Sequence, residues 1–257
     1  MRYPKGTVLV KADRDIPLLL HVRNAKFISH QQLFELMKSS AMEYSRDSFT
    51  WRVRRLVSDN YLERFQGEFG YGSAVYRITR RGLIQLESHS QFATVLNSKT
   101  LHLPHPSHAP HALELNTVRL ALLQQSLLLA WKTDVEIASE NTVSTHPLEK
   151  DYDAIVDVWN QDNAARFALE YERTLKNLQQ YDRVRQALEA EDSVNCILYL
   201  TSGEEITRHL SRELSGIQKR LAFATAKAFR ESLLDTHVLV IAGQPLVPFR
   251  SLLHGVF

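Results

Sequence analysis

Apolar side chains between residues 47 and 60 recur with the spacing of an α-helix. Phe49, Val53 and Leu56 fall on one stripe of a helical wheel. The opposite side of the wheel collects Trp51, Arg54, Arg55 and Ser58. The pattern therefore predicts an amphipathic helix with one apolar face and one basic, aromatic face.

The pattern changes from helical to extended after this helix. Residues 61–65 and 74–79 are rich in aromatic and β-branched side chains, which favours two strands. Between them lie Gly67, Gly70 and Gly72. Glycines supply the turn of a hairpin because they adopt backbone angles that other residues avoid. A helix that leads into a glycine-tipped hairpin is typical of a winged helix-turn-helix.

Two further helices are predicted upstream, at residues 16–27 and 33–42. Ser29 and Gln32, just before the second helix, have the spacing of a capping box. Together with the hairpin, these helices complete a winged helix-turn-helix domain that is predicted to span residues 1–96.

Neither pattern continues through residues 97–112, where three prolines interrupt the chain. This stretch is predicted to be a linker between two domains. Residues 113–257 then alternate between helical and extended patterns, which indicates a mixed α/β domain and an α/β fold class for the chain. Helices are predicted at 113–127, 174–191 and 205–233, and strands at 128–138, 151–159, 165–172, 194–202 and 237–243.

Positive charge is concentrated around the predicted helix and hairpin. Residues 46–81 contain eight arginines and four acidic residues, a local net charge of +4, whereas the whole chain of 257 residues carries +2. Arginine binds phosphates and guanine edges through two donors at once, so we predict double-stranded DNA as the partner. The residues expected to bind it are Trp51, Arg52, Arg54, Arg55, Ser58, Arg64, Arg77 and Arg80. The alternative is that this basic face is simply solvated.

Three carboxylates gather on two neighbouring predicted strands of the second domain. Antiparallel pairing through a turn at 160–164 places Asp153 opposite residues 170–172, and Glu170 and Glu172 share one face of their strand. Such carboxylates repel one another unless Mg²⁺ or solvent separates them. The alternative is that they are solvated or pair with nearby cations, namely Arg173, Lys176 and Arg183.

The second domain resembles the PD-(D/E)XK, or restriction-endonuclease-like, fold. The resemblance rests on Glu114 in a helix, Asp153 in a second strand, and Glu170 and Glu172 at the end of a third. The whole chain, with its segments HALELNTVRLAL and FALEYER, resembles the replication-relaxation family of bacterial plasmids and integrative elements. For an active site, the resemblance implies catalytic Asp153, Glu170, Glu172 and Lys176, and Mg²⁺ bound by Glu114, Asp153 and Glu170.

Glu172 stands where active nucleases of this fold usually have lysine, and the nearest lysine, Lys176, follows one helical turn later. Lysine there helps to position and activate the attacking water. Its replacement favours a sequence-specific DNA-binding protein, a transcriptional regulator of a plasmid or integrative element, with an inactive nuclease-like domain and no cofactor. The alternative is a Mg²⁺-dependent DNA endonuclease acting in replication or transfer, in which Lys176 reaches back over Glu172.

The remaining features concern compartment and assembly. The chain has one cysteine, Cys196, and no apolar run of the roughly 20 residues that cross a bilayer. We therefore expect a cytoplasmic protein without membrane contact. We also expect a homodimer, because one winged helix covers too little DNA for tight specific binding. Two apolar stripes serve the dimer or, alternatively, cover the sheet: Leu175, Leu178 and Tyr181 form the first, and Leu210, Leu214, Ile217 and Leu221 form the second.

Overall fold

Two compact units make up the chain, residues Met1–Asn116 and Thr117–Phe257. The structure, a computed structural model, describes residues 10–67, 69, 72–99, 103–240 and 243–253. The second unit has the mixed α/β composition that the sequence predicts.

The segment predicted to be a linker, residues 97–112, lies within the first unit. Ala109 is buried beside Phe27 in a hydrophobic cluster, and helix α5 (Ala109–Gln124) begins at this alanine. Pro110 is tolerated because a proline in the first turn of a helix removes only an N–H that has no partner within the helix. The prolines therefore precede and open a helix rather than mark a free linker.

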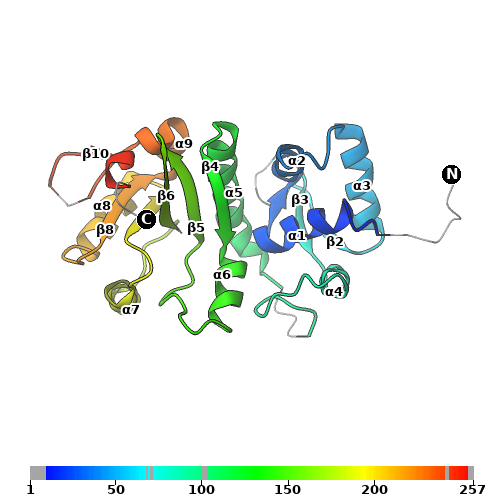
Figure 1. The fold of residues 1–257 in the computed structure, drawn as a ribbon, viewed down its shortest axis with the longest axis horizontal. Coiled ribbons are helices and arrows are strands. Elements are labelled where there is room, and N and C mark those ends of the chain that lie inside the picture. The colour runs from blue at the N-terminus through cyan, green and yellow to red at the C-terminus, as the bar shows by residue number, and fades with distance from the viewer. Residues whose placement is uncertain (1–9, 68, 70–71, 100–102, 241–242, 254–257) are drawn as a thin grey trace, which may run out of the picture. The chain divides into compact units, whose positions relative to one another are not determined.

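Helices pack around a small antiparallel sheet in the first unit (Figure 1). Its elements are α1 (Asp15–Ala25), β1 (Ile28–Ser29), α2 (His30–Ser39), α3 (Arg46–Ser58), β2 (Leu62–Phe65), β3 (Val75–Ile78), α4 (Arg80–Ser88) and a 3-10 helix (Pro106–His108). The strands lie in the order β1-β3-β2, and Leu62 pairs with Ile78. The predicted helices and hairpin are confirmed, while Gly70 of the turn lies outside the described residues.

Local sequence signals place these helices as expected. Phe49, Val53 and Leu56 of α3 are all buried, so the predicted apolar face is confirmed. At the start of α2, the Ser29 hydroxyl accepts a hydrogen bond from the Gln32 N–H at 3.2 Å. The Gln32 side chain accepts one from the Ser29 N–H at 3.1 Å. This reciprocal capping satisfies N–H groups that the helix itself leaves without partners.

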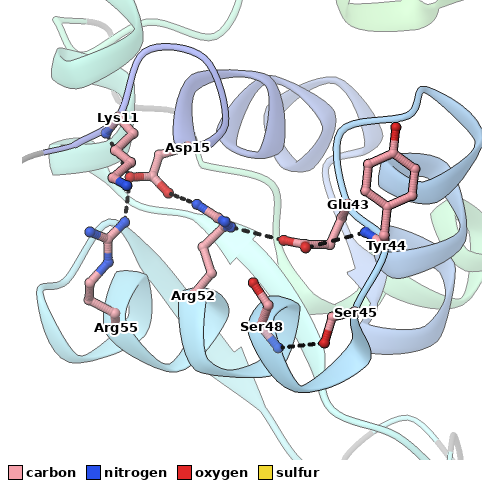
Figure 2. A network of polar contacts seen from close by, with 8 residues as sticks. All are labelled: Lys11, Asp15, Glu43, Tyr44, Ser45, Ser48, Arg52 and Arg55. Atoms are coloured by element: carbon pink, nitrogen blue, oxygen red, sulfur yellow. Dashed lines mark hydrogen bonds and ion pairs between the residues drawn. The ribbon is translucent and has the colours of Figure 1, made fainter.

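A buried ion-pair network joins α1, α3 and the segment after α2 (Figure 2). Arg52 donates hydrogen bonds to Asp15 Oδ1 and Glu43 Oε2, each at 3.2 Å. Asp15 also pairs with Arg55 and accepts a hydrogen bond from the Lys11 N–H at 2.7 Å. The side chains of Asp15, Glu43 and Arg52 are at most 6% exposed. One buried guanidinium therefore holds together elements that are distant in the sequence.

Within the described residues, a mixed sheet of five strands forms the centre of the second unit (Figure 1). Its strands lie in the order β4-β5-β6-β7-β8, with antiparallel pairing up to β6 and parallel pairing beyond it. Besides α5, the elements are β4 (Leu128–Thr133), α6 (Asp134–Asn141), β5 (Ala154–Asn160), β6 (Asn163–Glu172), α7 (Leu178–Ala190), β7 (Cys196–Thr201), α8 (Glu204–Glu213), β8 (Arg220–Thr225), α9 (Ala226–Ser232), β9 (His237–Val238) and β10 (Val247–Pro248), with 3-10 helices at Leu233–Asp235 and Phe249–Leu252.

Helices α7 and α8 contribute to the core on one face of this sheet. Tyr181 and Leu188 of α7 are buried in the same cluster as Tyr199 of β7. The second apolar stripe considered for the dimer is buried in that cluster as well, namely Leu210, Leu214, Ile217 and Leu221. The stripe therefore covers the sheet, and its interpretation as a dimer surface is wrong.

Three stretches differ from the predicted elements. Residues 134–138, predicted as strand, belong to α6, because Thr133 and Glu136 form a reciprocal capping box that starts a helix. Residues 220–225, predicted as helix, form β8, whose pairing with β7 outweighs the helix propensity of its alanines. The final strand is shorter than predicted, since β9 contains only His237 and Val238.

We predict that Arg52→Ala lowers the free energy of unfolding by about 3–5 kcal/mol, because it leaves the buried carboxylates of Asp15 and Glu43 without their shared partner. Arg54→Ala, at an exposed position two residues further along the same helix, is the matched control and should change stability by no more than about 0.5 kcal/mol. Urea denaturation followed by circular dichroism measures both. Equal unfolding midpoints for the two variants would show that the network does not hold the unit together.

Candidate functional site

A groove of about 490 Å³ lies between helix α3 and the β2–β3 hairpin of the first unit. Its lining includes His30, Thr50, Arg54, Ser58, Arg64 and Tyr76. The helix contributes its exposed side and the hairpin contributes the residues of one strand face. Helix α3 and the hairpin, whose arginines were both predicted to bind DNA, thus share one concave surface.

The groove is positively charged. Arg54 and Arg64 are exposed, and neither side chain has a hydrogen bond or ion pair within the described part of the chain. Burial, followed by the charges of Arg46, Arg64 and Arg54, lowers the pKa of His30 below its usual value of 6.5. Beyond the effect of burial, three arginine charges act on His30 in one direction, as expected in a positive potential, which attracts anions.

Hydrogen bonds fix the histidine at the back of this groove. His30 Nδ1 lies 2.9 Å from the Tyr76 hydroxyl, and Nε2 lies 3.2 Å from the Thr50 hydroxyl. A neutral imidazole has one donor and one acceptor nitrogen, and both partner hydroxyls can serve either role. His30 therefore links α2, α3 and β3 without adding a charge of its own. No pattern in the sequence indicated a role for this residue.

Three arginines expected to bind DNA are engaged inside the protein instead. Arg52 is buried between Asp15 and Glu43, so its assignment to the DNA-binding set is corrected. Arg55 pairs with the same Asp15 and lies over the Trp51 ring. The acidic partners, Asp15 and Glu43, come from other segments of the chain, so a helical wheel of α3 alone does not show them.

Arg77 of the hairpin is also held internally. Its guanidinium donates hydrogen bonds to the Glu63 carboxylate, one of them at 3.0 Å, and to the Pro104 carbonyl at 2.5 Å. The same group lies over the rings of Phe27 and Phe65. Arg77 therefore has a structural role, which corrects its prediction as a DNA contact.

The other predicted DNA contacts keep an exposed position. Trp51 is 65% exposed on α3, and Ser58 lies on the same helix at the groove. Arg80, at the first position of α4, is exposed but does not line the groove. Trp51, Arg54, Ser58 and Arg64 are therefore available to a ligand of the groove or of its rim.

The predicted acidic cluster forms where β5 and β6 pair in the second unit. Ala154 pairs with Leu169, which brings the preceding Asp153 beside Glu170. Asp153 Oδ2 accepts a hydrogen bond from the Tyr171 N–H at 2.7 Å. The predicted proximity of Asp153 to residues 170–172 is confirmed by this register.

Two lysines supply the positive charge of the cluster. Lys176 donates a hydrogen bond to Glu172 Oε1, so it does reach back over Glu172. Lys150 forms an ion pair with Glu170 Oε2. Sequence reasoning missed Lys150, because it lies in the irregular segment between α6 and β5, where no periodicity shows which way a side chain points.

Burial dominates the electrostatics of these groups. Burial raises the pKa of Glu170, the Lys150 ammonium lowers it, and the charge of Asp153 raises it further. Burial also lowers the pKa of Lys176, and Lys150 acts in the same direction. Glu170 Oε1 and the hydroxyls of Tyr152 and Tyr199 are buried and have no hydrogen-bond partner among the described residues. The cluster therefore contains buried polar atoms whose hydrogen-bonding capacity is not filled by the described residues.

The fit to a metal ion can be tested on the donor set. Mg²⁺ requires an octahedron of oxygen ligands, commonly one or two carboxylates with water and phosphate oxygens. Within the described ranges no group of three or more His, Cys, Asp or Glu side chains is arranged to hold a metal ion. Lysine ammonium groups instead contact Glu170 and Glu172. The arrangement of these residues therefore does not fit a metal site. Glu114, the other predicted ligand, belongs to the first unit.

Comparisons with known proteins give little further constraint. No protein-family model and no curated protein sequence matches the chain. Among solved structures, restriction endonuclease FokI shows a weak similarity, with a TM-score of 0.31 and 10% sequence identity. The match covers 88% of this chain and 45% of that structure's chain. A TM-score this low does not establish a common fold.

In the described part of the chain, no helix has the length and apolarity that crossing a membrane requires.

We predict that His30 titrates below 6.5 and that Arg64→Ala or Arg54→Ala raises its pKa, because each substitution removes a positive charge that disfavours the imidazolium. The measurement is the pH titration of the His30 ring protons by nuclear magnetic resonance. Arg81→Ala is the control, since Arg81 lies over the Tyr61 ring and is not among the charges that act on His30. An unchanged His30 midpoint in both groove variants would refute the positive potential.

Proposed function

We propose that this protein binds double-stranded DNA through the groove between α3 and the β2–β3 hairpin. The observation that carries the proposal is that Arg54 from the helix and Arg64 from the hairpin line one groove, and neither side chain has an internal partner among the described residues. The order of helices followed by a hairpin supports a winged helix-turn-helix, with α3 as the recognition helix and the hairpin as the wing. Unpaired arginines in a concave basic surface suit phosphates and guanine edges.

The exposed side of α3 has the geometry that this role needs. Trp51, Arg54 and Ser58 are three and four residues apart, so they follow one another along a single helix face. In the proposed complex this face enters the major groove, where Arg54 reads a guanine and Ser58 contacts either strand. Arg64, on the wing, contacts the phosphate backbone beside it.

In this proposal the protein is a sequence-specific transcriptional regulator of a mobile element, and its second unit, a nuclease-like domain, holds a homodimer. Leu175 and Leu178, before and at the start of α7, are 47% and 71% exposed and offer apolar surface for a second copy. A sedimentation mass near 29.5 kDa at micromolar concentration, the mass of one chain, would contradict the dimer.

A second candidate function is DNA cleavage at the acidic cluster, as a Mg²⁺-dependent endonuclease. The observation that favours it is the position of Lys176, whose ammonium contacts Glu172 and acts on the charge of Glu170. In this candidate function, Lys176 takes the role of the lysine that the motif lacks at position 172. The charge of Asp153 then acts on both Glu170 and Lys176, and the charges of Glu170 and Lys176 act on each other.

For DNA binding, we predict that Arg54→Ala weakens binding to a selected duplex by about 1–3 kcal/mol and relaxes its sequence preference, as expected for a base contact. Arg64→Ala should weaken binding to all duplexes alike and reduce the slope of log affinity against log salt by about 1. Fluorescence anisotropy with a duplex selected from a random pool measures both.

The matched control for these variants is Lys99→Ala, which removes one exposed charge of the same unit outside the groove. It should leave both the affinity and the salt slope close to those of the unmodified protein. If Arg54→Ala and Arg64→Ala bind as tightly as this control, the groove is not the DNA interface.

For cleavage, we predict that any nicking of supercoiled plasmid in Mg²⁺ or Mn²⁺ falls about 100-fold in Asp153→Asn and in Lys176→Ala, because one electrostatic contact to a transition state is typically of that magnitude. Asp157→Asn is the control on the same strand, since Asp157 pairs with Arg166 outside the cluster. Absence of nicking in the unmodified protein removes this second candidate. Nicking that persists in Asp153→Asn assigns it to another site or a contaminant.

A further inference from the structure

His30 connects two hydroxyl groups of the groove between α3 and the hairpin. Its Nδ1 atom lies 2.9 Å from the Tyr76 hydroxyl, and its Nε2 atom lies 3.2 Å from the Thr50 hydroxyl. All three residues line the groove. A neutral imidazole has one donor and one acceptor nitrogen, so one of the two hydroxyls must donate its own proton to the ring. While His30 is neutral, only the other hydroxyl is able to donate to a ligand.

Protonation of the ring changes what the hydroxyls can do. An imidazolium donates from both nitrogens, so Thr50 and Tyr76 each accept a hydrogen bond from it. Both hydroxyl protons are then free to be donated to an acceptor in the groove. A phosphate oxygen is a strong acceptor, and its negative charge also stabilises the imidazolium. Protonation of His30 and binding of a phosphate therefore favour each other.

We propose that His30 is a positioning residue of the groove: it takes up a proton when a DNA phosphate binds beside Arg64, and it then directs the hydroxyls of Thr50 and Tyr76 toward that phosphate. This inference rests on the proposed DNA-binding function and adds regulation by pH to the same site. The proton comes from solvent and stays on the ring while the phosphate is bound.

The arginines of the groove lie next to these hydroxyls. Arg64 of β2 pairs with Tyr76 of β3, and the side chains of such a cross-strand pair lie on the same face of the sheet. Thr50 precedes Arg54 by four residues, so both lie on one side of α3, and both line the groove. A phosphate held by Arg64 therefore binds in the groove that carries both hydroxyls.

The groups around His30 favour its neutral form in the free protein. Burial, followed by the charges of Arg46, Arg64 and Arg54, lowers the pKa of His30 below its usual value of 6.5. Arg46 and Arg54 face it from α3 and Arg64 from β2, and arginines do not lose their charge in proteins. Burial raises the pKa of Tyr76, which faces His30 from β3, so this hydroxyl keeps its proton. Of these five groups, His30 is the one that titrates between about pH 5 and 8.

The direction of the pH dependence follows from the charge of the phosphate. An opposite charge within about 4–6 Å shifts a pKa by about one unit or more, so bound DNA should raise the pKa of His30 by at least that amount. Because the pKa is then higher in the complex than in the free protein, affinity for DNA rises as the pH falls through the pKa of the complex. The gain is complete below the pKa of the free protein and is about tenfold for each unit of difference.

The direct experiment follows the His30 ring protons of the full chain by nuclear magnetic resonance as the pH is varied, with and without a saturating selected duplex, in buffer free of phosphate. The His30 signals are identified by cross-peaks to the Phe49 ring, whose centre lies 4.9 Å from that of the imidazole. We expect the titration midpoint to rise by about one pH unit or more in the complex. A midpoint that is unchanged or lower while the duplex is bound would overturn the inference and leave DNA binding intact.

A second experiment measures duplex affinity by fluorescence anisotropy at about pH 5 and about pH 8, on either side of the expected midpoints. The glutamine of His30→Gln takes up no proton, so the ratio of the two affinities should be about tenfold smaller than in the unmodified protein. A loss of affinity common to both pH values cancels in this ratio. His89→Gln is the matched control and should keep the ratio, because His89 belongs to the same unit and does not line the groove.

Equal ratios in His30→Gln and in the unmodified protein would also overturn the inference. Absence of duplex binding at every pH would overturn both the inference and the proposed function, whereas the other adverse outcomes leave that function in place. Circular dichroism at both pH values checks that the variants fold. The magnetic resonance experiment uses the unmodified protein, so it decides the inference even if His30→Gln does not fold.

Discussion

Both units depend on one constraint, which is that a charge removed from water must meet an opposite charge inside the protein. In the first unit, Arg52 meets Asp15 and Glu43 and thereby joins α1, α3 and the segment after α2. In the second, Glu170 meets Lys150 at the pairing of β5 and β6. Each pair connects segments that are distant in the sequence, so the elements pack in the arrangement that satisfies these charges.

The same constraint separates structural arginines from those available to a ligand. Residues 46–81 carry a net charge of +4, but Arg52 and Arg77 use their donors on internal carboxylates and carbonyls. Of the arginines in this region, Arg54 and Arg64 line the groove beside α3. The proposed DNA interface is therefore smaller than the basic region of the sequence, and its specificity depends on few side chains.

Local patterns predicted much of the fold. The buried face of α3 and the Ser29 capping box depend on neighbours within a few residues, so periodicity and spacing found them. The register of Asp153 against β6 was also predictable, because a short turn joins the two strands. Prediction failed where a partner lies far away: Asp15 is 37 residues from Arg52. Lys150 was missed because its segment has no regular period.

In the proposed complex, Arg54 and Arg64 contact DNA while Arg52 remains buried inside the first unit. The most direct measurement is the titration of arginine-selectively ¹⁵N-labelled protein with duplex DNA, followed through the side-chain Nε–H signals. We expect the Arg54 and Arg64 signals to shift with added duplex, whereas the Arg52 signal stays in place because Arg52 remains hydrogen-bonded to Glu43. A shift of the Arg52 signal with unchanged Arg54 and Arg64 signals would contradict it.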